Sequence, residues 1–279
     1  MKTVFSLEPI RKISSELRKN GRTIGFIPTM GALHQGHLKL VKESKNKNDV
    51  TIVSIFVNPA QFSPTEDLDK YPRPFEQDKK LLEQGKVDYL FFPNAKIMYP
   101  NDFQTYVTSN KLGNILEGKS RPGHFSGMAT VVLKLFNLVQ PTNAYFGQKD
   151  FQQSVVVKHM VSDLNLPINV NVVPTVRDKE GLALSSRNIF LSSQERLQAL
   201  SLYQSLLLGK KLISEENKNV QMIKTAIKNY LQEYKLICLD YIEICNPKNL
   251  SPVKIAAKKS VILIAAYAGK TRLIDNIII

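Results

Sequence analysis

The sequence predicts an α/β fold in which an open, doubly wound parallel sheet is followed by a smaller C-terminal α+β domain. Short runs rich in β-branched residues alternate with amphipathic segments as far as residue 173. Two long helical segments and three strand-like runs then follow without alternation. The chain has 279 residues, 43% of them hydrophobic, which is enough for one large or two ordinary domains. We expect domains at residues 1–175 and 176–279.

The first domain begins with a short strand and an amphipathic helix within residues 1–21. The runs TIGFIPT (23–29) and DVTIVSIFV (49–57) indicate buried strands, and the helix between them completes a right-handed βαβ unit. Its further elements are a helix at 74–85, a strand at 87–92, a helix at 127–139, a strand at 143–147, a helix ending near 164 and a strand at 168–173. The second domain should contain helices at 193–213 and 220–234 and strands at 240–245, 260–268 and 271–279.

The stretch PTMGALHQGH, residues 28–37, lies at the end of the first buried strand and leads into an amphipathic helix. Amides at a helix N-terminus can hold an anion, and Gly31 and Gly36 leave room for a nucleotide. Residues three apart share a helical face, so His34 and His37 can both face the same phosphates. On this motif alone, an ordinary glycine turn stays open as the alternative.

The segment FVNPAQF, residues 56–62, follows the second buried strand. Ligands of open α/β sheets bind beyond the carboxyl ends of the strands, so Gln61 should face the same crevice as His34 and His37. Its amide both donates and accepts, which suits a hydroxy acid. The alternative is that Asn58, Pro59 and Gln61 only build a turn.

The segment GQKDFQQ, residues 147–153, forms a second junction between a strand and a helix. Lys149 can supply a positive charge to phosphates. Asp150 can accept from a ribose hydroxyl or cap the helix, whose first turn holds Gln152 and Gln153. An ordinary helix start is the alternative.

The segment LALSSRN, residues 182–188, follows the last strand of the alternation. Ser185, Ser186 and Arg187 bring together hydroxyls, loop amides and a forked guanidinium that suit an anion. The segment can close over a bound nucleotide, or it is a serine-rich connector.

The net charge of +14 raises the question of a nucleic-acid partner. The lysines are scattered over segments rich in Glu and Gln, and no Arg-rich stripe or basic-aromatic interleaving is present. We therefore expect no nucleic-acid partner, although the charge can steer anionic substrates toward the protein.

Several other chemistries lack their motifs. The sequence GKT at 269–271 resembles the end of a P-loop, but Ile264 stands where that loop needs glycine. No G-x-G-x-x-G follows the first strand, and no G-x-S-x-G elbow is present. His34 and His37 have no third ligand at metal spacing, so we expect no metal site, and His159 should be structural.

The chain has no apolar run of about 20 residues and no apolar core of a secretory signal near its start. Cys238 and Cys245 lie seven apart in an apolar stretch, which is no metal spacing. We expect two buried, reduced thiols, no membrane contact and a cytoplasmic protein.

These motifs together resemble the pantoate–β-alanine ligases, or pantothenate synthetases, a family of the H-x-G-H nucleotidylyltransferase superfamily. The resemblance spans nearly the whole chain. It includes the motifs above, EDLDKYPR (66–73), RPGHFSGMATVVLKLFNLVQP (121–141), CNP (245–247) and GKTRLIDN (269–276).

The resemblance implies a Rossmann-like N-terminal domain, a smaller C-terminal domain that closes over ATP, and a homodimer. It implies condensation of pantoate with β-alanine through an enzyme-bound pantoyl adenylate, with ATP as substrate, Mg²⁺ carried with ATP, and release of AMP and pyrophosphate. The resemblance implies His37 as proton donor. We expect His34, Lys149 and Arg187 to be catalytic as well, because they can stabilise charge on the phosphates. The implied substrate residues are Gln61, for pantoate and β-alanine, and Gln153, for pantoate. The implied ATP-binding residues are Met30, Gly31, Ala32, Leu33, His34, Gln35, Gly36, His37, Gly147, Gln148, Lys149, Asp150, Val176, Leu184, Ser185, Ser186 and Arg187.

One position departs from the family pattern. The family usually has FGEKD where this chain has FGQKD, so a role that needs a carboxylate at position 148 is in doubt. Two alternatives stay open: another H-x-G-H nucleotidylyltransferase, which leaves AMP attached to its product, and an RNA-binding module on a synthetase-like fold.

Overall fold

The computed structural model describes residues 1–63, 68–215 and 218–279 and divides the chain into two compact units. Unit 1 comprises Met1–Gly147 and Gln152–Val173, and unit 2 comprises Gln148–Phe151 and Pro174–Ile279. Four residues, Gln148–Phe151, therefore belong by their contacts to unit 2, although both of their flanking segments belong to unit 1.

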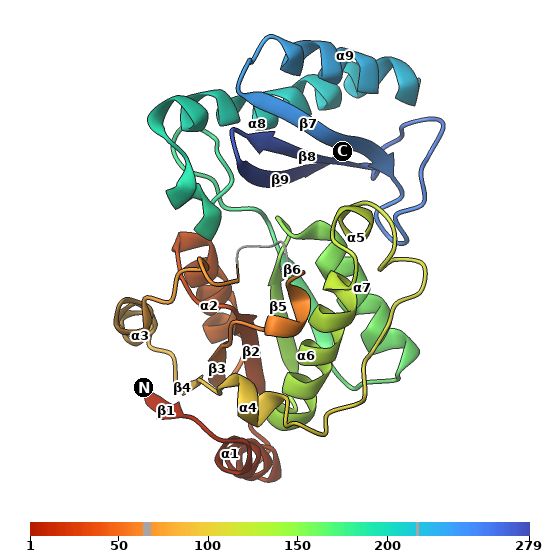
Figure 1. Ribbon diagram of the computed structural model, residues 1–279. Coiled ribbons are helices and arrows are strands. Elements are labelled where there is room, and N and C mark those ends of the chain that lie inside the picture. The colour runs from red at the N-terminus through yellow and green to blue at the C-terminus, as the bar shows by residue number, and fades with distance from the viewer. Residues whose placement is uncertain (64–67, 216–217) are drawn as a thin grey trace. The chain divides into compact units, whose positions relative to one another are not determined.

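The described part of unit 1 contains a parallel sheet of six strands in the order β1-β4-β3-β2-β5-β6 (Figure 1). The strands are β1 (Lys2–Val4), β2 (Ile24–Thr29), β3 (Val50–Ile55), β4 (Tyr89–Phe91), β5 (Asn143–Gly147) and β6 (Asn169–Val173). Every residue of β3 is buried, as a strand covered on both faces requires. The predicted Rossmann-like, doubly wound sheet is confirmed.

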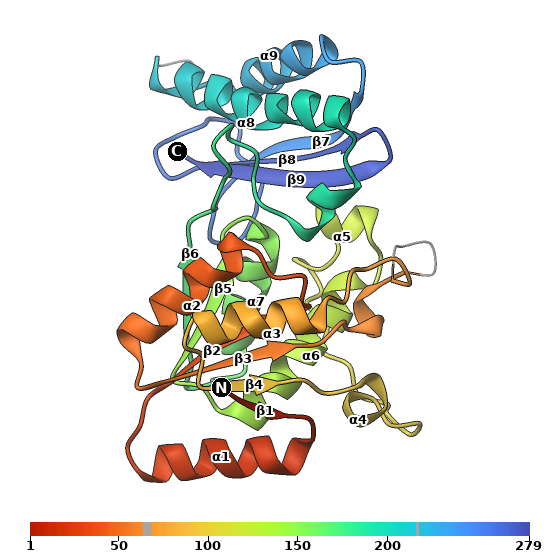
Figure 2. The same ribbon diagram turned by 90° about the vertical axis from the view of Figure 1, so that its left-hand side faces the viewer.

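Helices cover both faces of this sheet (Figures 1 and 2). The described helices before residue 174 are α1 (Leu7–Lys19), α2 (Gln35–Lys47), α3 (Phe75–Gln84), α4 (Ala95–Met98), α5 (Glu117–Ser120), α6 (His124–Val139) and α7 (Phe151–Asp163), with the short 3₁₀ helix η1 (Pro59–Gln61). Helices α2 and α3 lie on one face, and α1, α6 and α7 lie on the other. Right-handed crossovers between parallel strands produce this arrangement for the observed strand order.

The sheet order changes direction at β2 and β5. From β2 the chain continues to β3 on one side, whereas β5 pairs with β2 on the other side. In open α/β sheets, the crevice beyond the carboxyl ends of the strands at such a switch point is the usual ligand position. The segment that follows Thr29 and the segment that follows Gly147 leave the sheet there.

The described part of unit 2 contains an antiparallel sheet in the order β7-β8-β9 with two helices packed on it. Its elements are η2 (Ser186–Phe190), α8 (Ser193–Ser214), α9 (Val220–Gln232), β7 (Ile237–Cys245), β8 (Val261–Ala268) and β9 (Thr271–Ile278). Gly209 lets α8 pack closely, because a Cβ atom there would lie 2.8 Å from side-chain atoms of both Ile227 and Ile262. The predicted order of two helices followed by three strands is confirmed.

The prediction of two buried thiols is correct for one cysteine and wrong for the other. Both cysteines are free, but Cys245 is buried and Cys238 is exposed. Cys238 pairs with Tyr267 across β7 and β8, and Tyr267 is also exposed, so this part of the sheet face is open to solvent. Burial raises the pKa of the Cys245 thiol to about 12, which keeps it protonated and unreactive.

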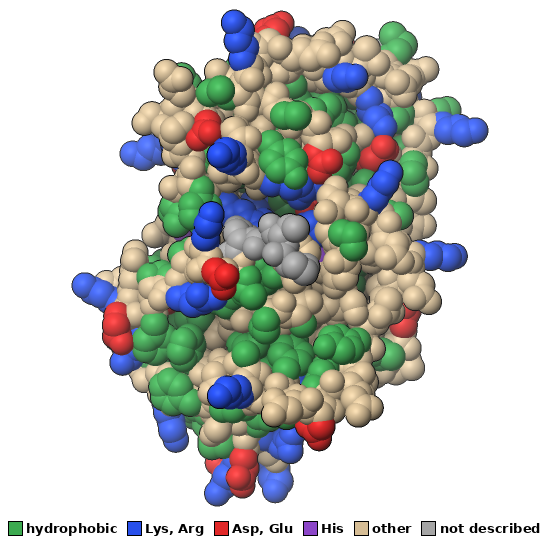
Figure 3. Space-filling model, viewed as in Figure 1, with side chains coloured by type: hydrophobic (Ala, Val, Ile, Leu, Met, Phe, Trp, Pro, Cys, Tyr) green, Lys and Arg blue, Asp and Glu red, His purple; other side chains and the backbone are tan. Residues whose placement is uncertain are grey.

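Charged side chains are spread over the surface of each unit. On the face seen in Figure 3, most Lys and Arg side chains project separately, with Asp and Glu side chains among them.

Within the described ranges, none of the helices has the length and apolar character that crossing a bilayer requires. Glu66 and Asp67 of the EDLDKYPR motif lie outside the described residues.

Candidate active site

The segment after β2 turns sharply before α2 and is held there by Asp78 of α3. Gly31 has a φ of 86° and Ala32 a φ of 51°, and a left-handed turn of this kind directs successive amides toward one point. The Asp78 carboxylate accepts hydrogen bonds from the amides of Ala32 at 2.8 Å and Leu33 at 2.7 Å. Only 1% of Asp78 is exposed. Burial raises its pKa above the ordinary value, and the two amides offset part of this rise.

His34 and His37 close the first turn of α2. His34 is the N-cap residue, and its Nδ1 accepts the amide proton of Gly36 at 3.1 Å. The Nδ1 of His37 accepts the amide proton of His34 at 3.3 Å. A ring nitrogen that accepts a hydrogen bond carries no proton, so both neutral rings carry theirs on Nε2. The ring centroids lie 4.2 Å apart, which places two Nε2–H donors on neighbouring rings.

Several amides around this turn have partners within the protein, whereas the expectation that amides at the start of α2 hold an anion stays a prediction. The amides of Ala32 and Leu33 already bind Asp78, and those of His34 and Gly36 already bind imidazole nitrogens. Four donors of the H-x-G-H corner therefore fix its shape. The corner also carries the two imidazoles, whose ring centroids lie 4.2 Å apart.

Gln61 lies in η1, which begins at a cap formed by Asn58. The Asn58 Oδ1 accepts the Ala60 amide at 3.3 Å, and its Nδ2 donates to Gln61 Oε1 at 3.0 Å. The Gln61 Nε2 donates to the sulfur of Met30 at 2.9 Å. The structure thus brings Gln61 to the turn that follows β2, and FVNPAQF forms the turn that was the alternative to a substrate role. Both roles are compatible, since the turn fixes the Gln61 amide.

Helix α6 holds η1 in place through contacts with its backbone. A Cβ atom at Gly127 would lie 2.0 Å from the carbonyl oxygen of Ala60, so only glycine permits this approach. His124 Nδ1 lies 2.8 Å from the Gln61 carbonyl oxygen, and Arg121 Nη1 lies 3.1 Å from His124 Nε2. Because the carbonyl can only accept and the guanidinium can only donate, His124 carries its proton on Nδ1.

The two glutamines in the first turn of α7 have different surroundings. Gln152 is buried, accepts the Glu117 amide at 3.0 Å, and donates to the carbonyls of Leu112 and Ile115 at 2.7 and 2.8 Å. It therefore secures the segment before α5. Gln153, the residue expected to bind pantoate, is half-buried.

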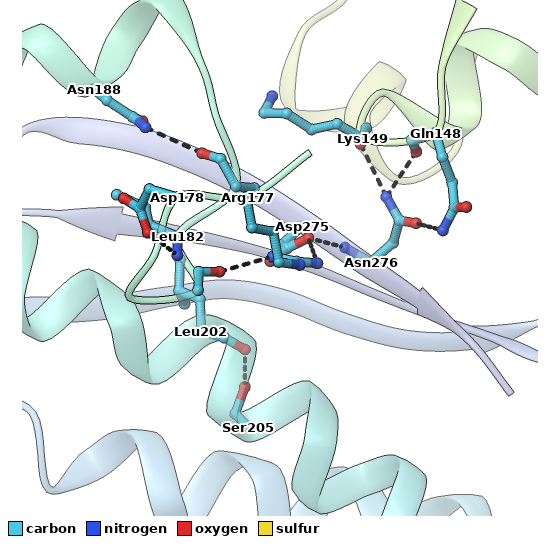
Figure 4. Close-up of polar contacts among 12 residues, drawn as sticks. Gln148, Lys149, Arg177, Asp178, Leu182, Asn188, Leu202, Ser205, Asp275 and Asn276 are labelled. Atoms are coloured by element: carbon cyan, nitrogen blue, oxygen red, sulfur yellow. Dashed lines mark hydrogen bonds and ion pairs between the residues drawn. The ribbon is translucent and has the colours of Figure 1, made fainter. Parts of the chain in front are cut away.

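In unit 2, the turn that carries Lys149 is bound to β9 through Asn276 (Figure 4). Asn276 Nδ2 donates to the carbonyls of Gln148 and Lys149, both at 2.9 Å, and Gln148 Nε2 donates to Asn276 Oδ1 at 3.1 Å. Lys149 Nζ lies 3.5 Å from Asp150 Oδ1. The backbone of this turn is therefore fixed, while the Lys149 side chain extends away from it (Figure 4).

The segment that carries Val176 and Leu184–Arg187 folds back on itself in unit 2. The Leu184 amide donates to the Val176 carbonyl at 3.0 Å, and Ser185 caps η2 by accepting the Arg187 amide at 3.2 Å. Arg177 secures the segment to β9 through two hydrogen bonds to Asp275, at 2.5 and 2.8 Å. Its guanidinium also lies 3.6 Å from the ring centroid of Tyr203.

Asp178 stabilises the same loop. Its carboxylate accepts the amides of Glu180 at 3.0 Å and Leu182 at 2.9 Å and also binds Arg196. Although burial acts to raise the pKa of Asp178, the Arg196 guanidinium and these two amides hold it below the ordinary value.

Within the described ranges, no group of three or more His, Cys, Asp or Glu side chains is arranged to hold a metal ion.

Comparison with known proteins places this chain in one family. The model of the family described as pantoate-beta-alanine ligase matches residues 2–278. The chain belongs to the pantoate–β-alanine ligase family. It is 52% identical over all of its 279 residues to the pantothenate synthetase of Caldicellulosiruptor saccharolyticus, of which it covers 99%.

Two crystal structures extend the comparison to three dimensions. The pantothenate synthetase of Thermus thermophilus is 42% identical, with a TM-score of 0.93 and 99% of both chains covered. The pantoate–β-alanine ligase of Francisella tularensis, solved with beta-gamma ATP and beta-alanine, is 39% identical, with a TM-score of 0.81 and coverage of 100% of this chain and 97% of that one. The family resemblance predicted from the motifs is confirmed.

Four residues that shape the site were not predicted as site residues. Asp78, His124, Asn276 and Asp275 contact segments that are distant from them in the chain. Asp78 has only a weak local signal, an acidic residue in the first turn of α3, whereas the other three lie inside motifs of the resemblance.

Proposed function

We propose that this chain catalyses the ATP-dependent condensation of pantoate with β-alanine, in two steps. In the first, a pantoate carboxylate oxygen attacks the α-phosphorus of ATP, pantoyl adenylate forms and pyrophosphate leaves. In the second, the β-alanine amine attacks the acyl carbon, the amide bond of pantothenate forms, and AMP leaves with the carboxylate oxygen. Family membership over residues 2–278 supports this reaction.

The observation that carries the proposal is the pair of imidazoles at the start of α2. Both hold their proton on Nε2, because both Nδ1 atoms accept amide protons. A donor fixed before the reaction stabilises charge that develops on the phosphates without further reorganisation. We assign His37 as proton donor to the leaving pyrophosphate and His34 as its partner in binding the phosphates.

The first step brings two anions together, and the repulsion must be offset. Two unit charges about 4 Å apart repel each other by about 4 kcal/mol at an effective dielectric constant of 20. Lys149 and Arg187 are the cations that we assign to this task. Positioning and charge stabilisation then account for the chemistry, and the reaction requires no protein nucleophile.

The remaining site residues divide between substrates. Gln61, whose amide is held by Asn58 and Met30, binds pantoate and borders β-alanine, and Gln153 binds pantoate. The ATP-binding residues are Met30–His37, Gly147–Asp150, Val176 and Leu184–Arg187.

The cofactor and the assembly complete the proposal. Mg²⁺ arrives with ATP and reduces the charge on its phosphates. The family resemblance supports a homodimer in the cytoplasm, and two free cysteines fit a reducing compartment. The Francisella tularensis structure with beta-gamma ATP and beta-alanine supports these two ligands for this chain.

The test is exchange of labelled pyrophosphate into ATP. We expect exchange only when pantoate is present, and release of free AMP once β-alanine is added. Exchange that ignores pantoate would exclude the substrate assignment. AMP that stays attached to the product would favour a nucleotidylyltransferase instead, and tight RNA binding that weakens steeply with salt would favour the RNA-binding module.

Two variants test the roles of individual residues. His37→Ala and Lys149→Ala should each lower the exchange rate by about 10²-fold or more, the scale for losing one fixed charge-stabilising group. His159→Ala in α7 and Lys228→Ala on the exposed side of α9 are the matched controls and should retain the wild-type rate. Wild-type rates in the first pair would remove both residues from the mechanism.

A further inference from the structure

Asn276 of β9 makes three hydrogen bonds to the turn that carries Lys149. Two go from its Nδ2 to the carbonyls of Gln148 and Lys149, and the third comes from Gln148 Nε2 to its Oδ1. Asn276 is only 2% exposed, so these polar atoms depend on one another for their partners. Both donors of the Asn276 amide are used on the backbone of a single turn (Figure 4).

We propose that Asn276 is a positioning residue that acts through Lys149. It touches no reacting group that we assign, but it fixes the carbonyls on both sides of the Lys149 peptide. The Lys149 side chain, which we assign to the charge between pantoate and ATP, starts from this turn. The position of its Nζ therefore depends on the turn. This inference rests on the proposed function, in which Lys149 offsets the repulsion between pantoate and ATP.

The neighbouring residue, Asp275, binds the other half of the unit 2 site. Its carboxylate holds Arg177, next to Val176, and also accepts the Asn276 amide at 2.8 Å. Two consecutive residues of β9 therefore organise two segments that are far apart in sequence, 148–149 and 176–184. The strand pairing of β9 with β8 extends through both residues and gives them a rigid base.

Gln148 belongs to the same arrangement. The Asn276 nitrogen faces the two carbonyls, so its oxygen must face Gln148, and the Gln148 amide supplies the matching donor. The glutamine that departs from the usual FGEKD pattern thus completes the hydrogen bonding of Asn276 without an added charge.

The experiment is a double-mutant cycle on pantoate-dependent pyrophosphate exchange. Asn276→Ala should lower the exchange rate by about 10²-fold, the loss that misplacement of a positioned group by about 1 Å can cause. If Asn276 acts only through Lys149, the double variant should match Lys149→Ala within about threefold. The pantoate KM should stay at the wild-type value, because Gln61 and Gln153 are untouched.

The control separates positioning from stability. Asn219 caps α9 by accepting the Met222 amide at 3.1 Å. Asn219→Ala should therefore lower the stability of unit 2 but leave the rate of pyrophosphate exchange unchanged. If Asn276→Ala fails to fold, Asn276→Asp keeps the shape and the bond from Gln148 while removing both donors, and it should show the same loss. A wild-type rate in the Asn276 variants, or losses that multiply to about 10⁴-fold in the double variant, would overturn the inference.

Hydrogen exchange measured on the peptide spanning residues 147–152 makes the result independent of catalysis. We expect faster exchange there in Asn276→Ala and no change in Asn219→Ala. If the wild-type protein shows no pantoate-dependent activity, the proposed function fails, but this measurement still decides whether Asn276 holds the turn. Equal hydrogen-exchange rates of this peptide in wild type and Asn276→Ala would overturn the inference.

Discussion

Replacing Asp78 tests how the H-x-G-H corner keeps its shape. The carboxylate is buried and accepts the amides of Ala32 and Leu33, the two residues that precede His34. Asp78→Asn keeps the size of the side chain but replaces one acceptor oxygen with a donor nitrogen. One of the two amides then faces a donor instead of an acceptor.

The expected loss in unfolding free energy follows from the number of buried amides that lose their hydrogen-bond acceptor. One buried amide without a partner costs about 1–3 kcal/mol, so Asp78→Asn should lower the free energy of unfolding by that amount. Asp78→Ala leaves both amides without a partner and should cost about 2–6 kcal/mol. Against a usual stability of about 5–15 kcal/mol, the alanine variant should approach the limit of a stable fold.

Equilibrium unfolding in urea, followed by circular dichroism, measures the change. Glu83→Gln is the matched control, because Glu83 is an exposed carboxylate on the same helix and its change should stay within about 0.5 kcal/mol. Pyrophosphate exchange should fall in Asp78→Asn, since the turn that sets His34 and His37 is loosened. Wild-type stability and exchange in both Asp78 variants would refute the reasoning.

Three other changes probe the scaffold of the site. Gly127→Ala should cost about 1–3 kcal/mol in unfolding free energy and raise the pantoate KM, because the added Cβ collides with the Ala60 carbonyl behind Gln61; Asn137→Ala, exposed on the same helix, should do neither, and an unchanged Gly127→Ala variant would contradict the packing. Arg177→Ala should cost about 3–5 kcal/mol in thermal unfolding, because Asp275 is left as a buried carboxylate without its cation, and Arg177→Lys should recover only part of this loss; equal stabilities of the three proteins would argue against the ion pair. The pKa of Asp178 is lowered in the folded state, so its stabilising effect is present above the unfolded pKa and is lost as the pH falls through the folded pKa. Urea unfolding below about pH 4 should therefore show a smaller difference in unfolding free energy between wild type and Asp178→Asn than unfolding at pH 7. A difference that does not change with pH would contradict this.

Local patterns predicted the elements and the corners where chemistry was expected. Runs rich in β-branched residues indicated β2 and β3, and the position of His34 before an amphipathic run predicted the start of α2. Such signals lie within a few residues of the feature that they predict, which is why they can be recognised in one sequence.

Contacts between distant residues could not be predicted in the same way. Asp78 acts on Ala32, Asn276 on Lys149, and Arg177 on Asp275, across separations of 46, 127 and 98 residues. The sequence suggested no internal acceptor for the amides of Ala32 and Leu33, which donate to the carboxylate of Asp78. Exposure of Cys238 likewise depends on which part of the β7–β8 face is left open, and the apolar run around it gives no sign of this.

The central claim is that a pantoate oxygen attacks the α-phosphorus of ATP and later leaves with AMP. Pantoate labelled with ¹⁸O in its carboxylate tests this claim. After reaction with ATP and β-alanine, the products are separated and the ¹⁸O content of each is measured by mass spectrometry. One labelled oxygen in AMP and none in pyrophosphate is the expected result. Label in pyrophosphate or orthophosphate, with unlabelled AMP, would mean that another phosphate is attacked and would contradict the proposed adenylate.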